Sequence, residues 1–336
     1  MADLTTKYAG LTLKNPVIAG ASNLVTDPDV VKKLEDAGVA AIVYKSLFEE
    51  QIQLESYQME EEMSRYDDLH AEMTSLFPDI EHAGPSEHLH QVEKLKKSVG
   101  IPVIASVNAV YEPTWGEYAQ KLEETGADAL EVNFFAVPKD AAKAEEDIVK
   151  EQLDVLSKIK SKVSIPVTVK LSPFYTNILK VVSDMDRAGA DGFVLFNRLF
   201  QPDINIETET MAFPYNLTHP EENRLALRFM GLLYGQVKAG LCANGGIFDG
   251  KDVIKMILAG ADAVQVVSTL YKNKPAHVGT MLKDIEQWMN GKDYGSLDDF
   301  RGKLSRKNIN DPFAYKRAQY VDILLKSDEM NKLFPI

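Results

Sequence analysis

The sequence predicts an α/β protein that folds as a closed (β/α)8 barrel. Eight short, β-branched segments alternate with helical patterns, and four of those helical patterns end in a similar glycine-containing repeat. The chain has 336 residues, whereas about 250 are typical of such a barrel, so insertions are expected. An open, doubly wound parallel sheet is the alternative arrangement of the same units.

The eight strand candidates are separated by segments long enough for a helix. They span residues 15–22 (NPVIAGAS), 40–46 (AAIVYKS), 101–108 (IPVIASVN), 129–135 (ALEVNFF), 165–172 (IPVTVKLS), 192–198 (GFVLFNR), 240–246 (GLCANGG) and 263–269 (AVQVVST).

A weak internal repeat marks the start of every second strand. The segments EDAGVAAIV, EETGADALEV, DRAGADGFV and ILAGADAVQV each place a glycine between a helix and a strand, at Gly38, Gly126, Gly189 and Gly260. Glycine suits the left-handed conformation that commonly ends a helix. The third and fifth strands begin instead with Ile-Pro-Val. Proline lacks a backbone N–H, but at the first position of a strand that hydrogen-bond donor is not needed. This odd/even alternation favours the barrel.

Two insertions and a tail depart from the repeat. Residues 47–84, after the second strand, are rich in Glu and Met and predict either an acidic surface helix or a lid over a substrate. Residues 199–223, after the sixth strand, predict a loop that is also placed to act as a lid. We expect the barrel to occupy residues 1–305 and a helical extension to follow over 306–336.

Composition excludes several classes of function. The formal net charge of -13 argues against binding to a nucleic-acid backbone, which requires dense Lys and Arg. A single cysteine, Cys242, allows neither an intrachain disulfide nor a self-contained iron–sulfur site, and no metal site is predicted. No apolar segment is long enough to span a bilayer, so we expect a cytoplasmic protein without membrane association.

Polar residues follow nearly every predicted strand. In barrels the chemistry lies at the carboxyl ends of the strands, and an unpaired ammonium or amide is costly to bury there without a ligand. The predicted ring comprises Ser22, Lys45, Ser46, Ser106, Asn108, Asn133, Lys170, Asn197, Gly245, Gly246, Ser268 and Thr269. We expect these residues to converge on a small-molecule ligand.

The last two units indicate that part of the ligand is a phosphate. Gly245 and Gly246 end the seventh strand, and Ser268 and Thr269 end the eighth, where barrels of this kind commonly bind phosphate. Two lysines in the ring fit a flavin, whose reduction leaves negative charge that an ammonium stabilises. Either lysine could instead form a Schiff base with a carbonyl substrate, as in a lyase.

The sequence resembles the dihydroorotate dehydrogenase family of FMN-dependent barrels. The resemblance runs over about residues 8–305 through LTLKNPVIAGAS, VYKS, EVNF, VTVKLSP, LFN, ANGGI, VVSTL and SLDDFRGKL. It implies that FMN is bound by Ala21, Ser22, Lys45, Ser46, Asn133, Lys170, Gly245, Gly246, Ser268 and Thr269, with Asn197 shared between flavin and substrate. Asn108 of the ring joins this predicted cofactor-binding set.

The resemblance also implies an activity and partners. It implies hydride transfer between dihydroorotate and flavin N5, with Lys45, Lys170 and Asn197 in supporting roles. Without an N-terminal membrane-associating helix, the chain is similar to the class 1 enzymes, which are homodimers or pair with a separate iron–sulfur electron-transfer subunit. Pyrimidine biosynthesis is the process that the resemblance implies.

The chain departs from the family at the position of the catalytic base. The family carries Asn-Leu-Ser-Cys-Pro-Asn, or a variant with serine for cysteine, where this chain has alanine at Ala136. The family's orotate-binding sequence has no counterpart in residues 47–84, and LTHPEENR replaces its glycine pair after the sixth strand. Substitute bases to consider are Ser172, Tyr175, His82, His88 and His90. A different substrate, a lyase and a flavin carrier without activity therefore stay open as alternatives.

Overall fold

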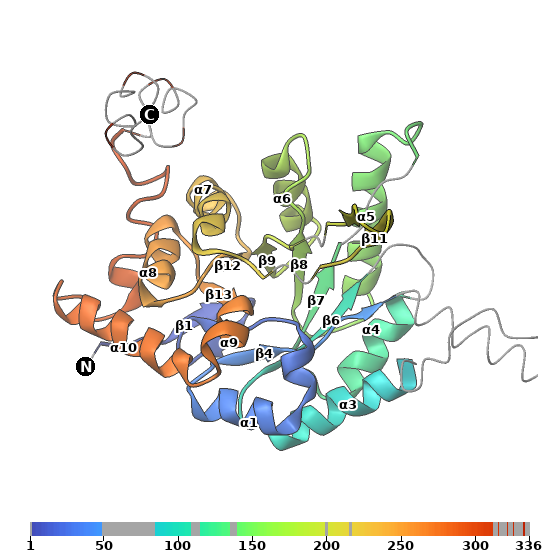
Figure 1. Ribbon diagram of the computed structural model, residues 1–336, viewed down its shortest axis with the longest axis horizontal. Coiled ribbons are helices and arrows are strands. Elements are labelled where there is room, and N and C mark those ends of the chain that lie inside the picture. Colours follow the sequence, from blue (N-terminus) through green and yellow to red (C-terminus); the bar gives the residue numbers. More distant parts are fainter. Residues whose placement is uncertain are drawn as a thin grey trace, which may run out of the picture.

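The computed structural model describes residues 2–48, 85–108, 115–134, 140–198, 201–214 and 217–311, together with the single residues 315, 321, 325 and 332. Eight parallel strands form a closed barrel in the order β4-β3-β13-β12-β9-β8-β7-β6, and the pairing of β6 with β4 closes the ring (Figure 1). This closure confirms the predicted (β/α)8 fold and excludes the open sheet.

The barrel strands coincide with the eight predicted segments. Their bounds are β3 Val17–Ala19, β4 Ala41–Val43, β6 Val103–Asn108, β7 Ala129–Asn133, β8 Val167–Leu171, β9 Gly192–Leu195, β12 Gly240–Asn244 and β13 Ala263–Val266. A two-residue strand, β5 (Leu47–Phe48), pairs with the end of β6 at the start of the predicted insertion. The rest of that insertion, residues 49–84, lies outside the described residues.

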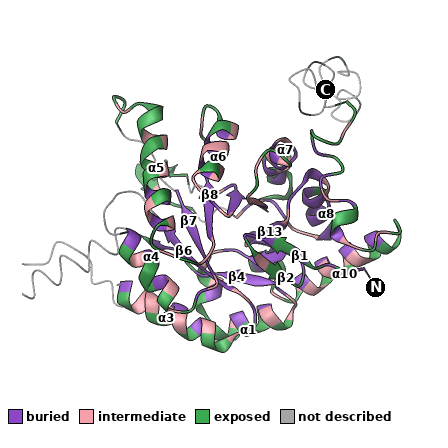
Figure 2. Ribbon diagram, turned by 180° about the vertical axis from the view of Figure 1, so that it is seen from behind, coloured by how far each residue is buried: buried purple, intermediate pink, exposed green. Residues whose placement is uncertain are grey.

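Helices surround the barrel and bury one face against it, as the purple inner surfaces in Figure 2 show. They are α1 Pro28–Asp36, α3 Pro85–Ser98, α4 Trp115–Glu124, α5 Glu145–Lys160, α6 Ile178–Arg187, α7 Asn223–Leu233, α8 Gly250–Ala259, α9 Ser268–Asn273 and α10 His277–Asn290. The described residues also include the short 3-10 helices η1 Asn23–Thr26, η2 Pro220–Glu222 and η3 Leu297–Asp299.

A hairpin that sequence reasoning did not anticipate closes the amino-terminal end of the barrel, which we call the floor. Strands β1 (Thr6–Tyr8) and β2 (Leu11–Leu13) pair with each other, and Tyr8 and Leu13 are buried among inward-facing barrel residues. The Tyr8 ring packs on the first residues of β9 and β12: a Cβ atom at Gly192 would lie 3.0 Å from it, and one at Gly240 2.9 Å. Because both strand starts are glycines, the Tyr8 ring of the floor hairpin fits against them.

The glycine-containing repeat serves the floor. Gly38, Gly126, Gly189 and Gly260 all have positive φ, which confirms the predicted left-handed conformation. In three of the repeats the following aspartate binds the backbone of the neighbouring strand: Asp128 accepts from the N–H of Val103, Asp191 from Val167 and Asp262 from Leu241. The repeat therefore sets the register of adjacent strand starts.

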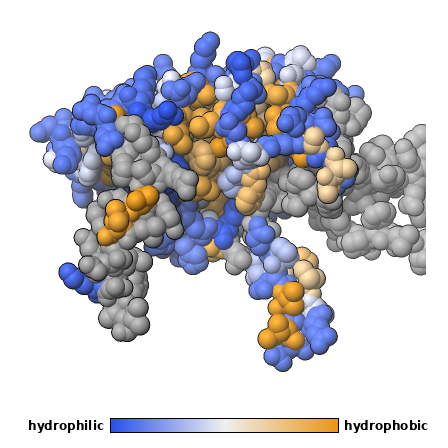
Figure 3. Space-filling model, turned by 90° about the horizontal axis from the view of Figure 1, so that it is seen from above, coloured by the Kyte–Doolittle hydropathy of each residue, from blue (hydrophilic) through white to orange (hydrophobic). Residues whose placement is uncertain are grey.

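One prediction about a segment outside the barrel was wrong. Residues 199–223 are not an irregular loop, because they contain an antiparallel hairpin of β10 (Asp203–Asn205) and β11 (Thr210–Ala212). Ile204 pairs with Met211, which places both on one face, and both are exposed. This hairpin is the coloured arm, partly orange, that projects from the body in Figure 3.

Residues 301–311, which include the predicted start of the helical extension at 306, form turns and bends, and the single described residues 321, 325 and 332 are helical. Most of residues 312–336 lie outside the described part, so the domain boundary stays a prediction. Among the described residues, no helix has both the length and the apolar character needed to cross a bilayer.

Candidate active site

The carboxyl ends of the strands, which we call the mouth, receive the inward-pointing side chains that end each strand. In β7, alternation turns Ala129, Glu131 and Asn133 to the barrel interior, while Leu130 and Val132 pack towards the helices. The same period turns Thr168 and Lys170 inwards from β8. Strand geometry alone therefore brings Asn133 and Lys170, paired across β7 and β8, to the mouth.

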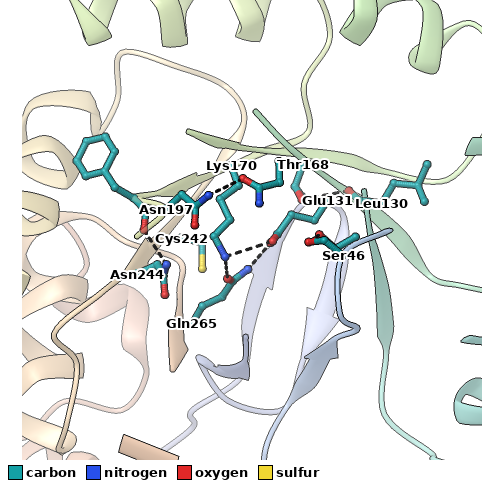
Figure 4. A network of polar contacts seen from close by, with 12 residues as sticks. Ser46, Leu130, Glu131, Thr168, Lys170, Asn197, Cys242, Asn244 and Gln265 are labelled. Atoms are coloured by element: carbon teal, nitrogen blue, oxygen red, sulfur yellow. Dashed lines mark hydrogen bonds and ion pairs between the residues drawn. The ribbon is translucent and has the colours of Figure 1, made fainter. Parts of the chain in front are cut away.

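A buried network of three side chains lies beneath the mouth (Figure 4). The Lys170 Nζ atom donates to Gln265 Oε1 at 3.1 Å and lies 3.5 Å from Glu131 Oε1. The Gln265 Nε2 atom in turn donates to Glu131 Oε2. Lys170 is 6% exposed, and Gln265 and Glu131 are each 1% exposed, so the ion pair is shielded from solvent.

The charge of this network acts on its neighbours. Burial raises the pKa of the Cys242 thiol well above its usual value; the Glu131 carboxylate raises it further, and the Lys170 ammonium opposes the rise. Burial also raises the pKa of Tyr8, with Cys242 and Glu131 adding to the effect. Both residues are thus held in their neutral forms. Cys242 is fully buried and free, as expected for a thiol that carries no chemistry here.

Side-chain amides line the other strand ends. Asn197 Nδ2 donates to Asn133 Oδ1 at 2.9 Å, so these two predicted residues do meet. The Asn108 side chain, 1% exposed, keeps its Nδ2 atom buried without a hydrogen-bond partner among the described residues. A buried, unsatisfied amide donor is costly. Asn108 therefore marks a place where a ligand would complete the structure.

The predicted residues of the first two units are only partly assembled. The Ser46 and Ser106 hydroxyls are hydrogen-bonded at 2.7 Å. Lys45 follows β4 and is exposed, and no hydrogen bond or ion pair joins it to another described residue. Ala21 and Ser22 are half-buried after β3, and the Ser22 side chain makes no capping bond to η1. Lys45 and Ser22 thus keep their polar groups available.

The glycine pair forms an open loop that is supported from beneath. Gly245 and Gly246 have φ values of 94° and 68°, and a Cβ atom at Gly245 would meet nothing within 4 Å. Asn223, which sequence reasoning missed, donates from Nδ2 to the Gly246 carbonyl at 3.2 Å and to Asp252 Oδ1 at 2.9 Å. Asp252 also accepts from the N–H of Phe248 at 3.0 Å. The loop is therefore held by hydrogen bonds on the side of Asn223 and Asp252, and it is open at Gly245.

The hydroxyls of Ser268 and Thr269 are occupied in the folded chain. The Ser268 Oγ atom accepts from the backbone N–H of Thr218 at 2.9 Å, and Thr269 Oγ1 donates to the Phe248 carbonyl at 2.9 Å. Both residues start α9 beside the glycine loop. Their backbone groups, rather than their hydroxyls, are the donors that this arrangement offers to an anion.

The predicted substitute bases differ in their surroundings. Ser172 accepts from the N–H of Phe174 within a turn. Tyr175 donates to Gln152 Oε1 at 2.9 Å, and burial raises its pKa to about 12. His88 packs edge-on against the Tyr44 ring at 5.2 Å; burial, aided by the Lys45 charge, lowers its pKa to about 4. His90 is exposed on α3.

Among the described residues, Ser172 and Tyr175 make their side-chain hydrogen bonds outside the polar ring of the mouth, whereas His88 lies close enough to the ring to be affected by the Lys45 charge. Ala136 and His82 lie outside the described residues. In the described part of the chain, no group of three or more potential metal ligands occurs together.

Glu131 and Gln265 are the site residues that sequence reasoning overlooked. Each is a polar residue flanked on both sides by apolar residues of its strand, in ALEVN and AVQV. That isolation was the available signal, since a buried polar group needs a partner.

A closed (β/α)8 barrel with a ring of amide, lysine and glycine groups at its mouth belongs to the class of barrel enzymes that act on small molecules. Comparison with known proteins makes this more specific. The family model described as "Dihydroorotate dehydrogenase" matches residues 3–289, and the chain therefore belongs to that family. The predicted resemblance and the prediction of an oxidoreductase are confirmed.

Curated relatives agree over most of the chain. The catalytic subunit of dihydroorotate dehydrogenase B (NAD(+)) from Thermoplasma volcanium is 28% identical over 309 residues, which cover 90% of this chain and 98% of the relative. The chloroplastic dihydropyrimidine dehydrogenase (NADP(+)) of Arabidopsis thaliana is 24% identical over 89% of this chain and 76% of its own. Dihydroorotate dehydrogenase A (fumarate) of Lactobacillus helveticus is 31% identical over 52% of this chain and 59% of its own.

Proposed function

We propose that the chain is an FMN-dependent oxidoreductase that binds its flavin across the barrel mouth and transfers hydride to or from a small, planar substrate. The observation that carries the proposal is a buried lysine at the carboxyl end of a barrel strand. Lys170 is held within a polar network and is accompanied at the mouth by the Asn133–Asn197 pair. An ammonium there is suited to stabilise the negative charge of a reduced flavin.

The residues present fit FMN at both of its ends. At the phosphate end, Gly245 leaves open space where any side chain would project, and backbone N–H groups near α9 lie beside it. At the ring end, the unsatisfied Asn108 amide and the available Lys45 ammonium offer donors that lack a partner among the described residues. Asn108 ends β6, which lies on the opposite side of the closed strand order from β12 and the glycine loop, so the two ends are far enough apart for an extended cofactor.

A bound flavin would supply a two-electron hydride acceptor, which the side chains of this barrel lack. The chain's own residues bind and orient. Lys170 and Lys45 place positive charge at the mouth, and Asn133 and Asn197 hold each other in a fixed orientation by their 2.9 Å hydrogen bond. The loop at Gly245 and Gly246 would hold the phosphate and so help to orient the cofactor towards the substrate.

The competing Schiff-base lyase receives less support from the geometry. A lysine nucleophile must lose its proton before it attacks a carbonyl. Lys170 lies 3.5 Å from Glu131 and donates to Gln265 in a buried network, so its Nζ atom is already engaged by two side chains. Lys45, the other candidate, is exposed and lacks the desolvated pocket that activates such lysines.

For the substrate we propose a reduced pyrimidine-type ring that is oxidised at a CH–CH bond. The relatives support this class, since their names specify dihydroorotate or dihydropyrimidine. Dihydroorotate is the substrate that most of these names give. In that reaction a base removes the proton at C5 while hydride leaves C6. With alanine at Ala136, the proton transfer lacks a side-chain base at the family position, which corresponds to a loss of about 10²- to 10⁴-fold.

The test is the visible absorption spectrum of the protein, loaded with FMN, before and after dihydroorotate is added without oxygen. Bleaching of the flavin bands is the expected result if dihydroorotate is the substrate. Bands that persist with dihydroorotate but bleach with a dihydropyrimidine assign the second substrate. Bands that persist with both would contradict the proposed substrate class. The variant Ala136→Cys should accelerate bleaching by dihydroorotate if only the base is missing.

We also propose that the chain passes electrons to a separate subunit. The support is that several relatives are named as catalytic subunits, a name that implies a further component. A homodimer is the accompanying proposal for the chain itself. Sedimentation of the purified chain, alone and with the product of any neighbouring gene, tests both.

A further inference from the structure

The buried network beneath the mouth connects strands that are not neighbours. Glu131 and Lys170 come from the adjacent strands β7 and β8, whereas Gln265 comes from β13, which β12 and β9 separate from β8. The Gln265 side chain therefore reaches across the barrel interior to meet the other two, as Figure 4 shows. Such a contact exists only because the barrel is closed.

Gln265 matches the charges on either side of it. Its Oε1 atom accepts from the Lys170 ammonium, and its Nε2 atom donates to the Glu131 carboxylate. A carboxylate could not donate, and a lysine could not accept. The amide thus bridges a cation and an anion and fixes both, while the ammonium, with three N–H donors, retains capacity for a ligand.

Burying these three polar side chains costs free energy that an apolar core would not. The inward-facing residues nearer the floor are mostly apolar, among them Ile18, Ala41, Val43 and Ile104. Replacing a buried ion pair by well-packed apolar residues is often neutral or stabilising. Stability alone therefore gives little reason to keep a lysine, a glutamate and a glutamine together in the barrel centre. A role at the mouth gives one.

The Lys170 and Glu131 charges sum to zero, and Gln265 is neutral, which limits the positive potential that Lys170 can offer a ligand. A carboxylate 3.5 Å from the ammonium offsets much of its positive potential. An anionic, reduced flavin at the mouth would then be stabilised less than by an isolated lysine.

We propose that Glu131 and Gln265 are positioning residues that hold the Lys170 ammonium and set the reduction potential of the flavin at the mouth. This inference rests on the proposed function. Glu131 lowers the potential by offsetting the positive charge of Lys170, and Gln265 keeps the pair in one geometry. Glu131 acts through Lys170 and takes no proton from the substrate.

Two isosteric substitutions change the network charge in opposite directions. Glu131→Gln removes one negative charge, and Gln265→Glu adds one. The double variant Glu131→Gln with Gln265→Glu exchanges the two groups and restores the composition of the network. Thr168→Val is the matched control, because Thr168 is buried beside Glu131 on the same strand as Lys170, and its hydroxyl donates to the Leu130 carbonyl at 3.1 Å rather than to Glu131, Lys170 or Gln265.

The measurement is the dissociation constant of FMN in its oxidised form and in its dithionite-reduced form, for the wild type and each variant. We expect Glu131→Gln to raise the preference for reduced FMN at least about tenfold, which is about a 30 mV rise for a two-electron couple. Gln265→Glu should lower that preference by a similar factor. The exchanged variant should lie between the two single variants, and Thr168→Val should match the wild type.

Several outcomes would overturn the inference. Single variants that shift the preference in the same direction, or an exchanged variant that lies outside the range of the single ones, would show that the network charge does not set the potential. If Glu131→Gln fails to fold, the sign of the Gln265→Glu shift still decides. A wild type that binds neither form of FMN would instead refute the proposed function, and with it the inference. FMN binding without shifts in the variants refutes the inference alone.

Discussion

The two ends of the barrel use polar residues in opposite ways. At the floor, Asp128, Asp191 and Asp262 each accept a hydrogen bond from a backbone N–H at the start of a neighbouring strand. At the mouth, the Asn108 amide donor has no partner among the described residues, and Lys45 is exposed without one. The three floor carboxylates find their partners within the chain, whereas the mouth holds donors that the described residues leave unpaired.

We therefore expect the stability of the fold to depend on the floor and FMN binding to depend on the mouth. Substitutions at the floor should lower the free energy of unfolding and leave FMN affinity unchanged. Substitutions of available groups at the mouth should do the reverse. Each of the following experiments tests whether the two ends of the barrel act independently.

The largest effect is expected in the glycine loop, where two neighbouring residues differ. A Cβ atom at Gly246 would lie 2.4 Å from the backbone nitrogen of Asn223, so Gly246→Ala should cost more than about 2 kcal/mol of stability and abolish FMN binding. Gly245→Ala meets no atom within 4 Å and carries only the strain of its positive φ. It should fold, yet bind FMN at least about tenfold more weakly. Urea unfolding and FMN titration distinguish the two variants. Equal FMN affinities for Gly245→Ala and the wild type would show that this loop does not bind the phosphate.

Lys45→Met should weaken FMN binding by about 10- to 100-fold, the usual value of one charge-assisted hydrogen bond. Lys45 is exposed, so the urea midpoint should not move. The matched control is Lys7→Met, the same substitution at an exposed position in β1 at the floor. Flavin fluorescence during titration measures both; a similar loss in the two variants would indicate a general effect of charge rather than a site.

Asp191→Ala at the floor should lower the free energy of unfolding by about 1–2 kcal/mol. It leaves the N–H of Val167 without its acceptor and removes the carboxylate from the partly exposed ion pair with Lys160. FMN affinity should stay within about twofold of the wild type, a difference of about 0.4 kcal/mol. A tenfold loss of affinity would show that floor and mouth are coupled.

The smallest effect concerns His88, a candidate base that packs like a core residue. Its folded pKa of about 4 lies below the ordinary value of 6.5, so the unfolded chain binds the extra proton first. Stability from the neutral ring is therefore present above pH 6.5 and lost as the pH falls towards 4. Between pH 7 and 5.5 the loss should be about 1 kcal/mol.

The variant His88→Phe should remove this part of the pH dependence, whereas His90→Gln, on the exposed face of the same helix, should retain it. Urea unfolding at the two pH values provides the measurement. If His88→Phe stopped flavin bleaching by substrate without changing stability, His88 would belong to the mouth as a base.

Local patterns made much of this architecture predictable. The β-branched segments, the glycines between helices and strands, and the alternation within strands located all eight barrel strands and placed Asn133, Asn197 and Lys170 at one end. These signals extend over a few residues and depend on backbone geometry alone.

Contacts between distant segments were not predictable in the same way. The partnership of Gln265 with Glu131 depends on barrel closure, which brings residues 134 positions apart together. The floor hairpin was missed because Tyr8 and Leu13 occur in short segments whose burial depends on the small residues Gly192 and Gly240. The β10–β11 hairpin was read as a loop because its polar composition outweighed its weak alternation.

The most direct test of the account is a titration of flavin-free protein with FMN, followed by quenching of flavin fluorescence. The account predicts one FMN per chain with a dissociation constant of about 1 μM or lower, because several otherwise unpaired groups gain partners. Fluorescence that stays unchanged at a hundred times that concentration would contradict the claim that the barrel mouth is a flavin site.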